Sequence, residues 1–378
     1  MADRAGRHRA LGTLASVALC CACCTAPDDA RAEPDLTSWL PTYYGPLRAR
    51  DLTPFGYLRL DMRPAFTSDV APGRWAFETE LSFQNTWAVS EPVKRYIRSF
   101  PARRELGAAD VRAIEALPGE NFLVDLELAE FGLTLHRQFM PEWGAFAVIT
   151  GVVYGGGALD GLVEQTHSAL GLSHMGRRGL RRDRFNVVLD LESLQYASLD
   201  SGSRSGLLDP TLGVRYSGVR LPQPWSLVLE AAAKVPLGGE RRFLSTGRTD
   251  VGLQASLMRR GTRHAFYASV AVVDYAGSGG RFPAEGRVVP TVVAGVESHL
   301  TARWHSIVQA YASPSLYGRD VTQLDELTSN KYLLSAGLRY HRGSQLFTVA
   351  VTENLAHMDN TPDVGFQVGW AYRPRRSD

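Results

Sequence analysis

Three polar residues near the middle of the chain have types and spacing that suit cation binding or proton transfer. Asp160, Glu164 and His167 are separated by four and three positions. At helical pitch this spacing places the three side chains on one stripe of a helix. Two carboxylates and an imidazole that converge can bind a divalent metal ion or act as general acid and base. Any amphipathic surface helix also presents a polar stripe, so we predict no metal ion, no cofactor and no catalytic residue here.

A basic cluster follows this stripe, with five arginines inside eight positions. Guanidinium groups bind phosphate oxygens in bidentate fashion, and on an extracellular loop such a cluster would suit outer-membrane lipids, including lipopolysaccharide. The alternative is a solvated run of charge. Nucleic acid is not an expected partner, because 41 Lys plus Arg are balanced by 39 Asp plus Glu. The five arginines are Arg177, Arg178, Arg181, Arg182 and Arg184.

Nucleophilic catalysis has little support in the sequence. Ser168 is adjacent to His167, but neighbouring residues on a helix point about 100° apart and cannot form a dyad. No G-x-S-x-G, H-E-x-x-H, P-loop or dinucleotide fingerprint occurs in a suitable context. The sequence therefore favours a protein that is not an enzyme, and an outer-membrane acyl hydrolase is the third-ranked alternative.

The four cysteines indicate export. Cys20, Cys21, Cys23 and Cys24 lie in an apolar stretch that follows a basic start and precedes the small-x-small sequence Ala30-Arg31-Ala32. We interpret residues 1–32 as a cleaved signal peptide, with a lipoprotein signal as the alternative interpretation. The mature chain would then contain no cysteine, which excludes disulfides and thiolate chemistry.

The elements that must position these side chains are strands, because apolar and polar residues alternate along most of the mature chain. Trp75, Phe77, Thr79, Leu81 and Phe83 share one face. This period of two is typical of a strand with one apolar and one polar side. The pattern predicts twelve strands, with ten or fourteen as alternatives. They are expected near 74–87, 122–139, 143–154, 207–219, 225–236, 249–259, 264–275, 289–298, 303–312, 331–341, 345–354 and 363–373.

The connections between these strands indicate a membrane barrel. Tight connections near 140–142 and 342–344 alternate with longer ones such as 88–121 and 155–206. Transmembrane barrels of the bacterial outer membrane have short periplasmic turns, longer extracellular loops and an even strand number. We therefore predict an all-β fold, a transmembrane antiparallel up-and-down barrel over 74–378. Residues 33–73 would form a periplasmic or plugging segment.

The longest predicted loop, 155–206, contains the polar stripe described above. Residues 159–170 are predicted to form a short amphipathic helix after the glycine run 155–157. Its two carboxylates would be costly in lipid, so we expect it within or over the barrel mouth. There its polar stripe would face either the aqueous lumen or the basic loop residues.

The polar faces of the predicted strands should line a wet lumen. Twelve strands fall between small filled barrels and wide porins, so a narrow channel is expected. The predicted lumen-lining residues are Glu78, Glu80, Asp125, Glu127, Arg215, Glu230, Lys234, Arg259, Glu297, Arg339 and Glu353.

Three segments carry a resemblance to a known family. They are Pro54-Phe55-Gly56-Tyr57-Leu58-Arg59-Leu60, the stretch from Gly155 to His167, and Gly365-Phe366-Gln367-Val368-Gly369-Trp370-Ala371-Tyr372. In these segments the chain resembles a Gram-negative outer-membrane family classed as a domain of unknown function. The resemblance implies an outer-membrane barrel that the barrel-assembly machinery inserts, and it carries over no catalytic residue.

The functional expectation is a narrow porin-like channel or transporter in the outer membrane. Its cargo would be a small solute or an apolar molecule. A structural or surface-interaction barrel without transport is the alternative, ahead of the acyl hydrolase.

Overall fold

A computed structural model describes residues 42–48, 56–63, 70, 72–171, 174–192, 194–200, 204–238, 243–275, 287–356 and 364–374. All of them belong to one compact unit, Pro41–Asp378. The predicted signal peptide, residues 1–32, lies outside the described residues. None of the helices in this part of the chain is long and apolar enough to cross a membrane.

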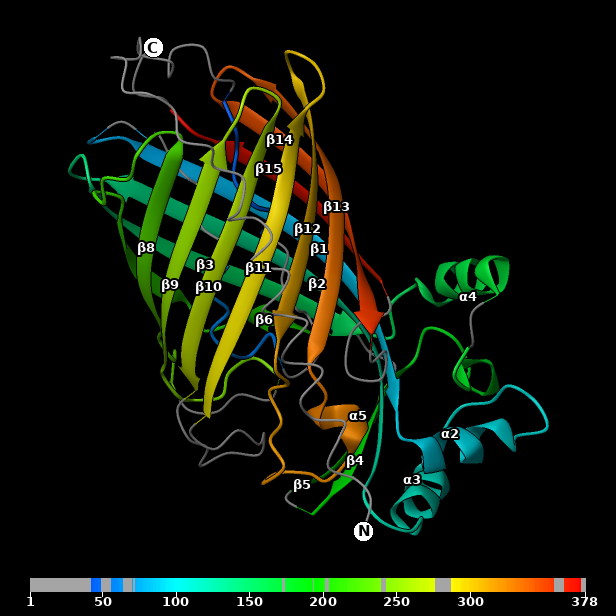
Figure 1. The fold of residues 1–378 in the computed structure, drawn as a ribbon. Coiled ribbons are helices and arrows are strands. Elements are labelled where there is room, and N and C mark those ends of the chain that lie inside the picture. Colours follow the sequence, from blue (N-terminus) through cyan, green and yellow to red (C-terminus); the bar gives the residue numbers. More distant parts are fainter. Residues whose placement is uncertain are drawn as a thin grey trace, which may run out of the picture. The chain divides into compact units, whose positions relative to one another are not determined.

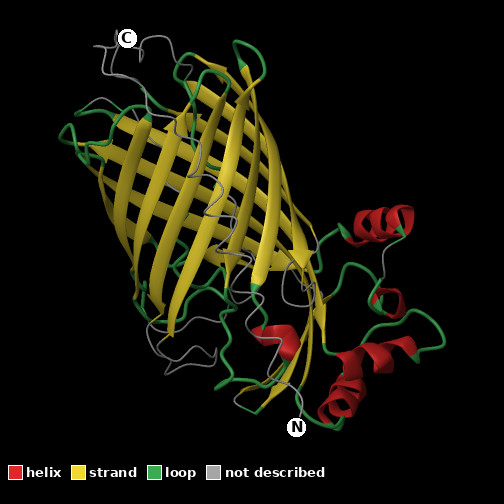
Figure 2. Ribbon diagram, in the orientation of Figure 1, coloured by secondary structure: helices red, strands yellow, loops and turns green. Residues whose placement is uncertain are grey.

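Twelve antiparallel strands close into a barrel, as the alternation predicts (Figures 1 and 2). Each strand pairs with its neighbour in the chain, and β1 closes the ring by pairing with β15 from Phe77–Tyr372 to Asn85–Val364. The barrel strands are β1 Trp75–Val89, β2 Asn121–Gln138, β3 Trp143–Gly155, β7 Thr211–Tyr216, β8 Trp225–Lys234, β9 Asp250–Arg260, β10 His264–Tyr275, β11 Arg287–His299, β12 Trp304–Ser313, β13 Lys331–Arg342, β14 Gln345–Ala356 and β15 Val364–Tyr372.

The remaining elements lie in the longer connections. Strand β2 continues past the barrel, where β4 pairs with its first residues and β5 pairs with β4. The short β6 continues the line of β7 along β3. These elements are α2 Glu91–Arg98, α3 Ala108–Glu115, α4 Asp160–Leu170, η2 Arg177–Gly179, β4 Phe185–Leu191, β5 Leu194–Asp200, β6 Arg204–Leu207 and α5 Asp325–Thr328.

The outward face of the barrel is apolar and exposed. Phe131 on β2 and Leu253 on β9 expose 52% and 63% of their surface, although both are large hydrophobic residues. At the end with the short turns the outward residues are aromatic, including Trp143, Trp225 and Trp304. An apolar band bordered by aromatic residues is the outer surface of a transmembrane barrel.

The inward face is polar and buried. Along β2 the even-numbered residues face the interior, among them Glu130, Thr134 and His136, while Phe131 and Arg137 face outward. Because successive side chains point to opposite faces of a strand, this parity separates lumen from lipid along each strand.

Candidate functional site

The N-terminal segment lies inside the barrel and is held by side chains of the wall. Residues 42–48 contact the wall between the Gly261 turn and Gln309 on β12. At the turn, the Tyr43 hydroxyl donates to the Gly261 carbonyl oxygen at 2.8 Å. Residues 56–63 contact it from Phe243, in the loop after β8, to Gln254 on β9. Together the two stretches occupy the lumen from the turn end to the loop end.

The stretch 42–48 is extended, and wall side chains satisfy its backbone groups. The Tyr44 amide donates to Glu297 at 3.0 Å, and the Leu47 amide donates to Gln309 at 2.8 Å. Arg339 donates to the carbonyl oxygens of Gly45 and Pro46 and also pairs with Glu297, at 3.1 Å. Buried backbone groups must be paired, and here side chains of the wall replace the usual neighbouring strand.

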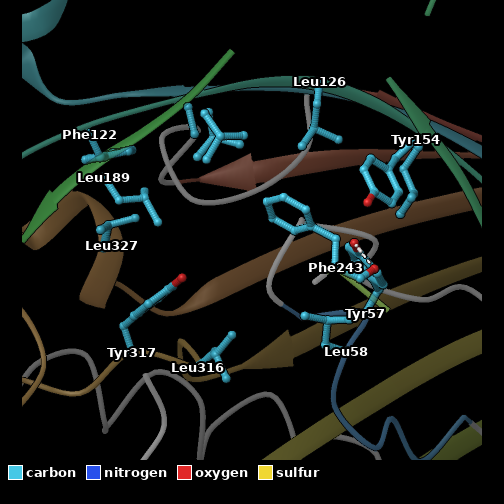
Figure 3. Close-up of a cluster of buried hydrophobic side chains, with 14 of the residues drawn as sticks. Tyr57, Leu58, Phe122, Leu126, Tyr154, Leu189, Phe243, Leu316, Tyr317 and Leu327 are labelled. Atoms are coloured by element: carbon cyan, nitrogen blue, oxygen red, sulfur yellow. Dashed lines mark hydrogen bonds between the residues drawn. The ribbon is translucent and has the colours of Figure 1, made fainter. Parts of the chain in front are cut away.

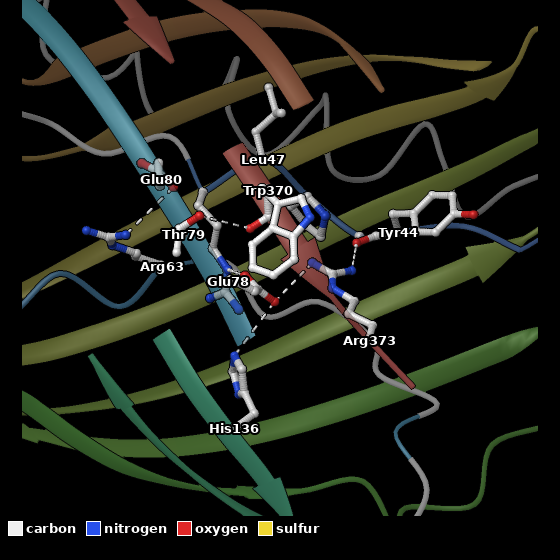
Figure 4. Close-up of polar contacts among 12 residues, drawn as sticks. Tyr44, Leu47, Arg63, Glu78, Thr79, Glu80, His136, Trp370 and Arg373 are labelled. Atoms are coloured by element: carbon white, nitrogen blue, oxygen red, sulfur yellow. Dashed lines mark hydrogen bonds and ion pairs between the residues drawn. The ribbon is translucent and has the colours of Figure 1, made fainter. Parts of the chain in front are cut away.

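The same region joins the segment to the seam between β1 and β15 (Figure 4). Glu78 accepts a hydrogen bond from Arg373 at 3.0 Å and lies 3.7 Å from His136. Arg373 also donates to the Tyr44 carbonyl oxygen at 2.7 Å, and Arg48 pairs with Glu78 at 3.2 Å. Glu78 thus links the segment to the two strands that close the barrel.

The stretch 56–63 is held by a second group of buried charges. Asp250 pairs with Arg59 at 3.3 Å and with Lys234 at 3.0 Å, and it accepts the Leu60 amide at 3.0 Å. Arg63 pairs with Glu130 at 2.5 Å. Buried charges are tolerated only when paired, so removal of one partner from such a group is strongly destabilising.

Two polar cavities flank the segment. One lies beside residues 57–63 and is lined by Arg59, His136, Glu230 and Lys234 among others. The other lies beside residues 46–48 and reaches Glu78 and Glu80. Arg48 and Arg63 line both, so the spaces on the two sides of the segment share a cationic boundary.

At the loop end, the tip of the segment enters an apolar cluster (Figure 3). Tyr57 and Leu58 are buried there with residues of β2, β3, β4 and the loops 243–244 and 316–327. Phe243 is central, because its ring lies 5.4 Å from Tyr154 and 5.9 Å from Phe185, and its carbonyl oxygen accepts the Tyr57 hydroxyl. The apolar cluster therefore closes the loop end of the lumen around the tip of the segment.

The structure places seven of the eleven predicted lumen residues on the interior face. They are Glu78, Glu80, Arg215, Glu230, Lys234, Glu297 and Arg339. Arg259 and Glu353 instead face outward, since they share parity with the exposed Leu253 and Val351. Arg259 lies over the Trp225 ring at 5.9 Å.

Asp125 and Glu127 also lie on the outer face, with the parity of Phe131, at the part of β2 that continues beyond the apolar band. Strict use of the period of two would have placed all four of these residues outward. It would also have found Glu130 and His136, which the sequence reasoning missed. Arg59 and Arg63 were missed because nothing in an extended, non-alternating segment indicates which wall it touches.

The predicted polar stripe belongs to α4, which covers the outer face of β1 and β2 instead of the lumen. Asp160 accepts hydrogen bonds from Asn85 on β1 and from Arg177, both at 3.1 Å. Glu164 is bound by Arg103 at 2.9 Å and Arg182 at 2.6 Å. Burial alone would raise the pKa of Glu164, but the hydrogen bonds from Arg182 and Arg103 lower it. The His167 side chain lies outside the described residues.

The structure brings most of the arginine cluster to carboxylates of the same loops. Arg177 is buried beside Asp160, Arg182 pairs with Glu164, and Arg181 and Arg184 both pair with Glu105. Arg178 differs, since its described contact is with the Ser168 hydroxyl, at 2.7 Å. Phosphate binding by these arginines stays a prediction, and Arg178 is the one of the five best placed for it.

Ser168 and His174 form a contact that the sequence did not suggest, at 3.2 Å between Oγ and Nε2. The Ser168 hydroxyl donates to the Glu164 carbonyl oxygen at 2.7 Å and accepts from Arg178. Since the serine proton is already bound by the helix backbone, His174 is not positioned to remove it. The described part of the chain also holds no group of three His, Asp or Glu side chains arranged for a metal ion.

Gly157 determines where α4 begins. Glu127 accepts the amides of Ala158 and Leu159, and a Cβ at Gly157 would lie 1.7 Å from the Glu127 carboxylate. We expect Gly157→Ala to displace α4 and to accelerate proteolysis of this loop in the folded protein. Gly171→Ala is the matched control, because its φ of +69° resembles the +68° of Gly157 but open space surrounds it. Both carry a backbone penalty of about 1–2 kcal/mol, so equal proteolysis of the two variants would contradict the role of Glu127.

Asp110 holds the loop between α2 and α3. It accepts hydrogen bonds from Arg104, the Tyr96 hydroxyl at 2.6 Å and the Gly107 amide, and the bond from Arg104 contributes most to lowering its pKa. A lowered pKa stabilises the fold above the unfolded value near 4 and loses this effect as pH falls further. Asp110→Asn should weaken the loop by about 1–3 kcal/mol at pH 7. Proteolysis should show a difference from wild type that shrinks below about pH 4. A difference that is constant with pH would contradict this.

A search of curated proteins found no match. Among solved structures, an outer-membrane channel from Pseudomonas putida F1 is 12% identical and covers 82% of this chain and 99% of its own, with a TM-score of 0.49. The toluene transporter TodX of P. putida is 10% identical and covers 81% of this chain and 91% of its own, with a TM-score of 0.38. The NanC porin is 10% identical and covers 65% and 93%, with a TM-score of 0.39.

One family model, described as a protein of unknown function (DUF3187), matches residues 109–373. The match begins in α3 and ends one residue after β15, so it includes eleven of the barrel strands and the helices between β3 and β4. The chain therefore belongs to the DUF3187 family.

Proposed function

We propose that this protein is a gated channel of the outer membrane of a Gram-negative bacterium. The observation that carries the proposal is the N-terminal segment inside a closed barrel, bound to the wall by side chains and not built into the sheet. The described stretches 42–48 and 56–63 of this segment are called the plug. Short turns would face the periplasm and the long loops the exterior, as in other barrels of this class.

The contacts of the plug suit a part that moves. Besides the apolar contacts of its buried side chains, many are hydrogen bonds and ion pairs to charged side chains, including Glu297, Arg339 and Asp250. When the lumen fills with water, these wall groups can be hydrated and the cost of losing the plug falls.

The two ends of the lumen differ in chemistry, which bears on the cargo. A solute from outside first meets the aromatic and aliphatic cluster around Phe243 and then the polar cavities beside Arg59 and Arg63. We infer a small molecule that combines an aromatic or apolar part with a hydrogen-bonding group. Pockets for such molecules are mostly apolar with a few placed polar groups.

Uptake into liposomes that contain the purified protein tests this function. A small aromatic alcohol should enter faster than a sugar of similar size, relative to protein-free liposomes. Equal rates for the two solutes would contradict the inferred cargo, and no uptake of either by correctly folded protein would contradict the channel.

The alternatives of a structural barrel and an acyl hydrolase receive less support. A purely structural barrel gives no reason for buried charges on both wall and plug, which cost free energy to desolvate. Hydrolysis would require Ser168 to give its proton to a base, but its hydroxyl already donates to the Glu164 carbonyl oxygen.

A further inference from the structure

A second site lies on the outside of the barrel, in the loop region. A cavity opens between the end of α2 and the turn 174–179. Its lining combines an apolar floor with a basic rim, and no Asp or Glu lines it. The floor is formed by Phe100 and Met175 above the buried Ile97, and the rim by Arg98, Arg103, His174 and Arg178.

Two of the arginines at this rim form no ion pair with the described residues. Arg98 and Arg178 are exposed, and within the described residues no carboxylate lies at ion-pair distance from either. Arg103 shares Glu164 with Arg182. This contrasts with Arg181 and Arg184 nearby, which are paired with Glu105. Among the described residues, the cavity therefore presents two cations that are not engaged in an ion pair.

The site is held in place from below. Ile97 is fully buried, and the Trp87 indole donates to the Met175 carbonyl oxygen at 3.1 Å. The Arg177 guanidinium lies over the same Trp87 indole, 5.3 Å from the ring centre. Met175 has a φ of 47°, which non-glycine residues rarely adopt, and these contacts fix it there. The backbone of the turn that carries Arg178 is thus held in place.

The position of the cavity along the barrel indicates the kind of ligand. Trp87 lies four residues beyond Phe83 on the outward face of β1, which is about 13 Å along the strand. Phe83 and its neighbour Phe131 are exposed by 40% and 52% and belong to the apolar band. Because barrel strands are tilted by about 35–45°, this step is roughly 10 Å along the membrane normal. A site that far above the apolar band lies at the depth of lipid headgroups.

We propose that this cavity binds the phosphate of a phosphorylated lipid of the outer leaflet, with Arg98 and Arg178 as the phosphate ligands. Arginine forks match phosphate oxygens in geometry and charge. The acyl chains would lie along the apolar band of Phe83 and Phe131, below the cavity and below the part of β1 and β2 that α4 covers. The inference does not depend on transport through the lumen.

Binding of fluorescent diphosphorylated lipid A to the full-length protein in detergent micelles tests the proposal. The test variant is Arg98→Ala/Arg178→Ala. The control variant is Arg95→Ala/Arg112→Ala, which removes two exposed arginines of α2 and α3 that do not line the cavity. Loss of two charge-assisted contacts should weaken binding roughly tenfold or more. Wild type and control should bind alike.

Two further probes identify what is recognised. Dephosphorylated lipid A should bind wild type as weakly as the test variant binds the diphosphorylated lipid. Inorganic phosphate at millimolar concentration should not displace the lipid. Equal affinity of the test and control variants, or equal affinity for the dephosphorylated lipid, would overturn the proposal. Full displacement by inorganic phosphate would assign the site to a soluble anion and overturn the lipid assignment. Heat-modifiable migration in gels confirms that each variant is folded.

Discussion

Deletion of residues 42–63 should convert a barrel that is closed at rest into a persistently open pore. The physical reason is that this segment occupies the lumen at both ends and in the middle, while the twelve strands pair without it. If the closed form of the intact protein holds about 99% of the population, removal of the plug raises the mean current about a hundredfold. Single-channel recording in planar bilayers measures this.

The barrel itself should survive the deletion. Wall charges such as Glu297 and Asp250 lose their plug partners, but water that enters the lumen replaces them. Heat-modifiable migration of the deleted form would establish that it is folded. A folded, plug-deleted barrel with the current of wild type would show that some other element closes the lumen.

Arg339→Ala should open the channel without removing any chain. Arg339 donates to two plug carbonyl oxygens and neutralises Glu297, which is fully buried when the plug is seated. Breaking a buried ion pair costs roughly 3 kcal/mol or more. Glu297 would keep the Tyr267 hydroxyl, the Tyr44 amide and His305 as neighbours, but it would lose its arginine. In the open state water hydrates Glu297, so the cost falls mainly on the closed state. The ratio of open to closed states should rise by about a hundredfold.

Arg215→Ala is the matched control for this variant. Arg215 is also a buried interior arginine, and it pairs with Glu230 on the neighbouring strand at 2.5 Å, so the pair joins wall to wall. We expect a comparable loss of barrel stability with little change in open probability. If both variants open the channel equally, general weakening of the interior and not the plug contact would be responsible.

The sequence predicted the barrel well because every second residue of a membrane-spanning strand faces lipid and is apolar, while the residues between face the lumen and are polar. All twelve expected strands are present, and the alternation of tight and long connections is confirmed. Register follows from the same rule, since a slip of one residue would turn Phe131 into the lumen and Glu130 into lipid. Strand ends moved by only a few residues, as for β7, which begins at Thr211.

The site was less accessible to sequence reasoning, for two reasons. Polar residues near strand ends, such as Arg259 and Asp125, can face outward because the apolar band is shorter than the strands. The plug has no periodicity, and its role follows from contacts more than 180 residues away in the chain, such as Gln254 with the Arg63 carbonyl oxygen. Similarly, spacing placed Asp160 and Glu164 on one stripe of a helix, but only the fold shows that this stripe faces Arg177 and Arg182 on the outer surface.

The most direct test of the central claim is a reversible lock between plug and wall. A Cβ added at Gly252 on β9 would lie 2.8 Å from the Met62 Cγ atom, so cysteines at these two positions have side chains close enough for a disulfide. The four native cysteines all lie within residues 20–24, in the predicted signal peptide, and would not compete after cleavage.

The measurement is solute uptake and channel current of Met62→Cys/Gly252→Cys before and after reduction, with each single cysteine variant as a control. If the plug must move for the channel to open, the oxidised double variant is closed and reduction restores the activity of the single variants. Equal activity of the oxidised and reduced double variant, with the disulfide verified by mass spectrometry, would contradict a plug that gates the lumen.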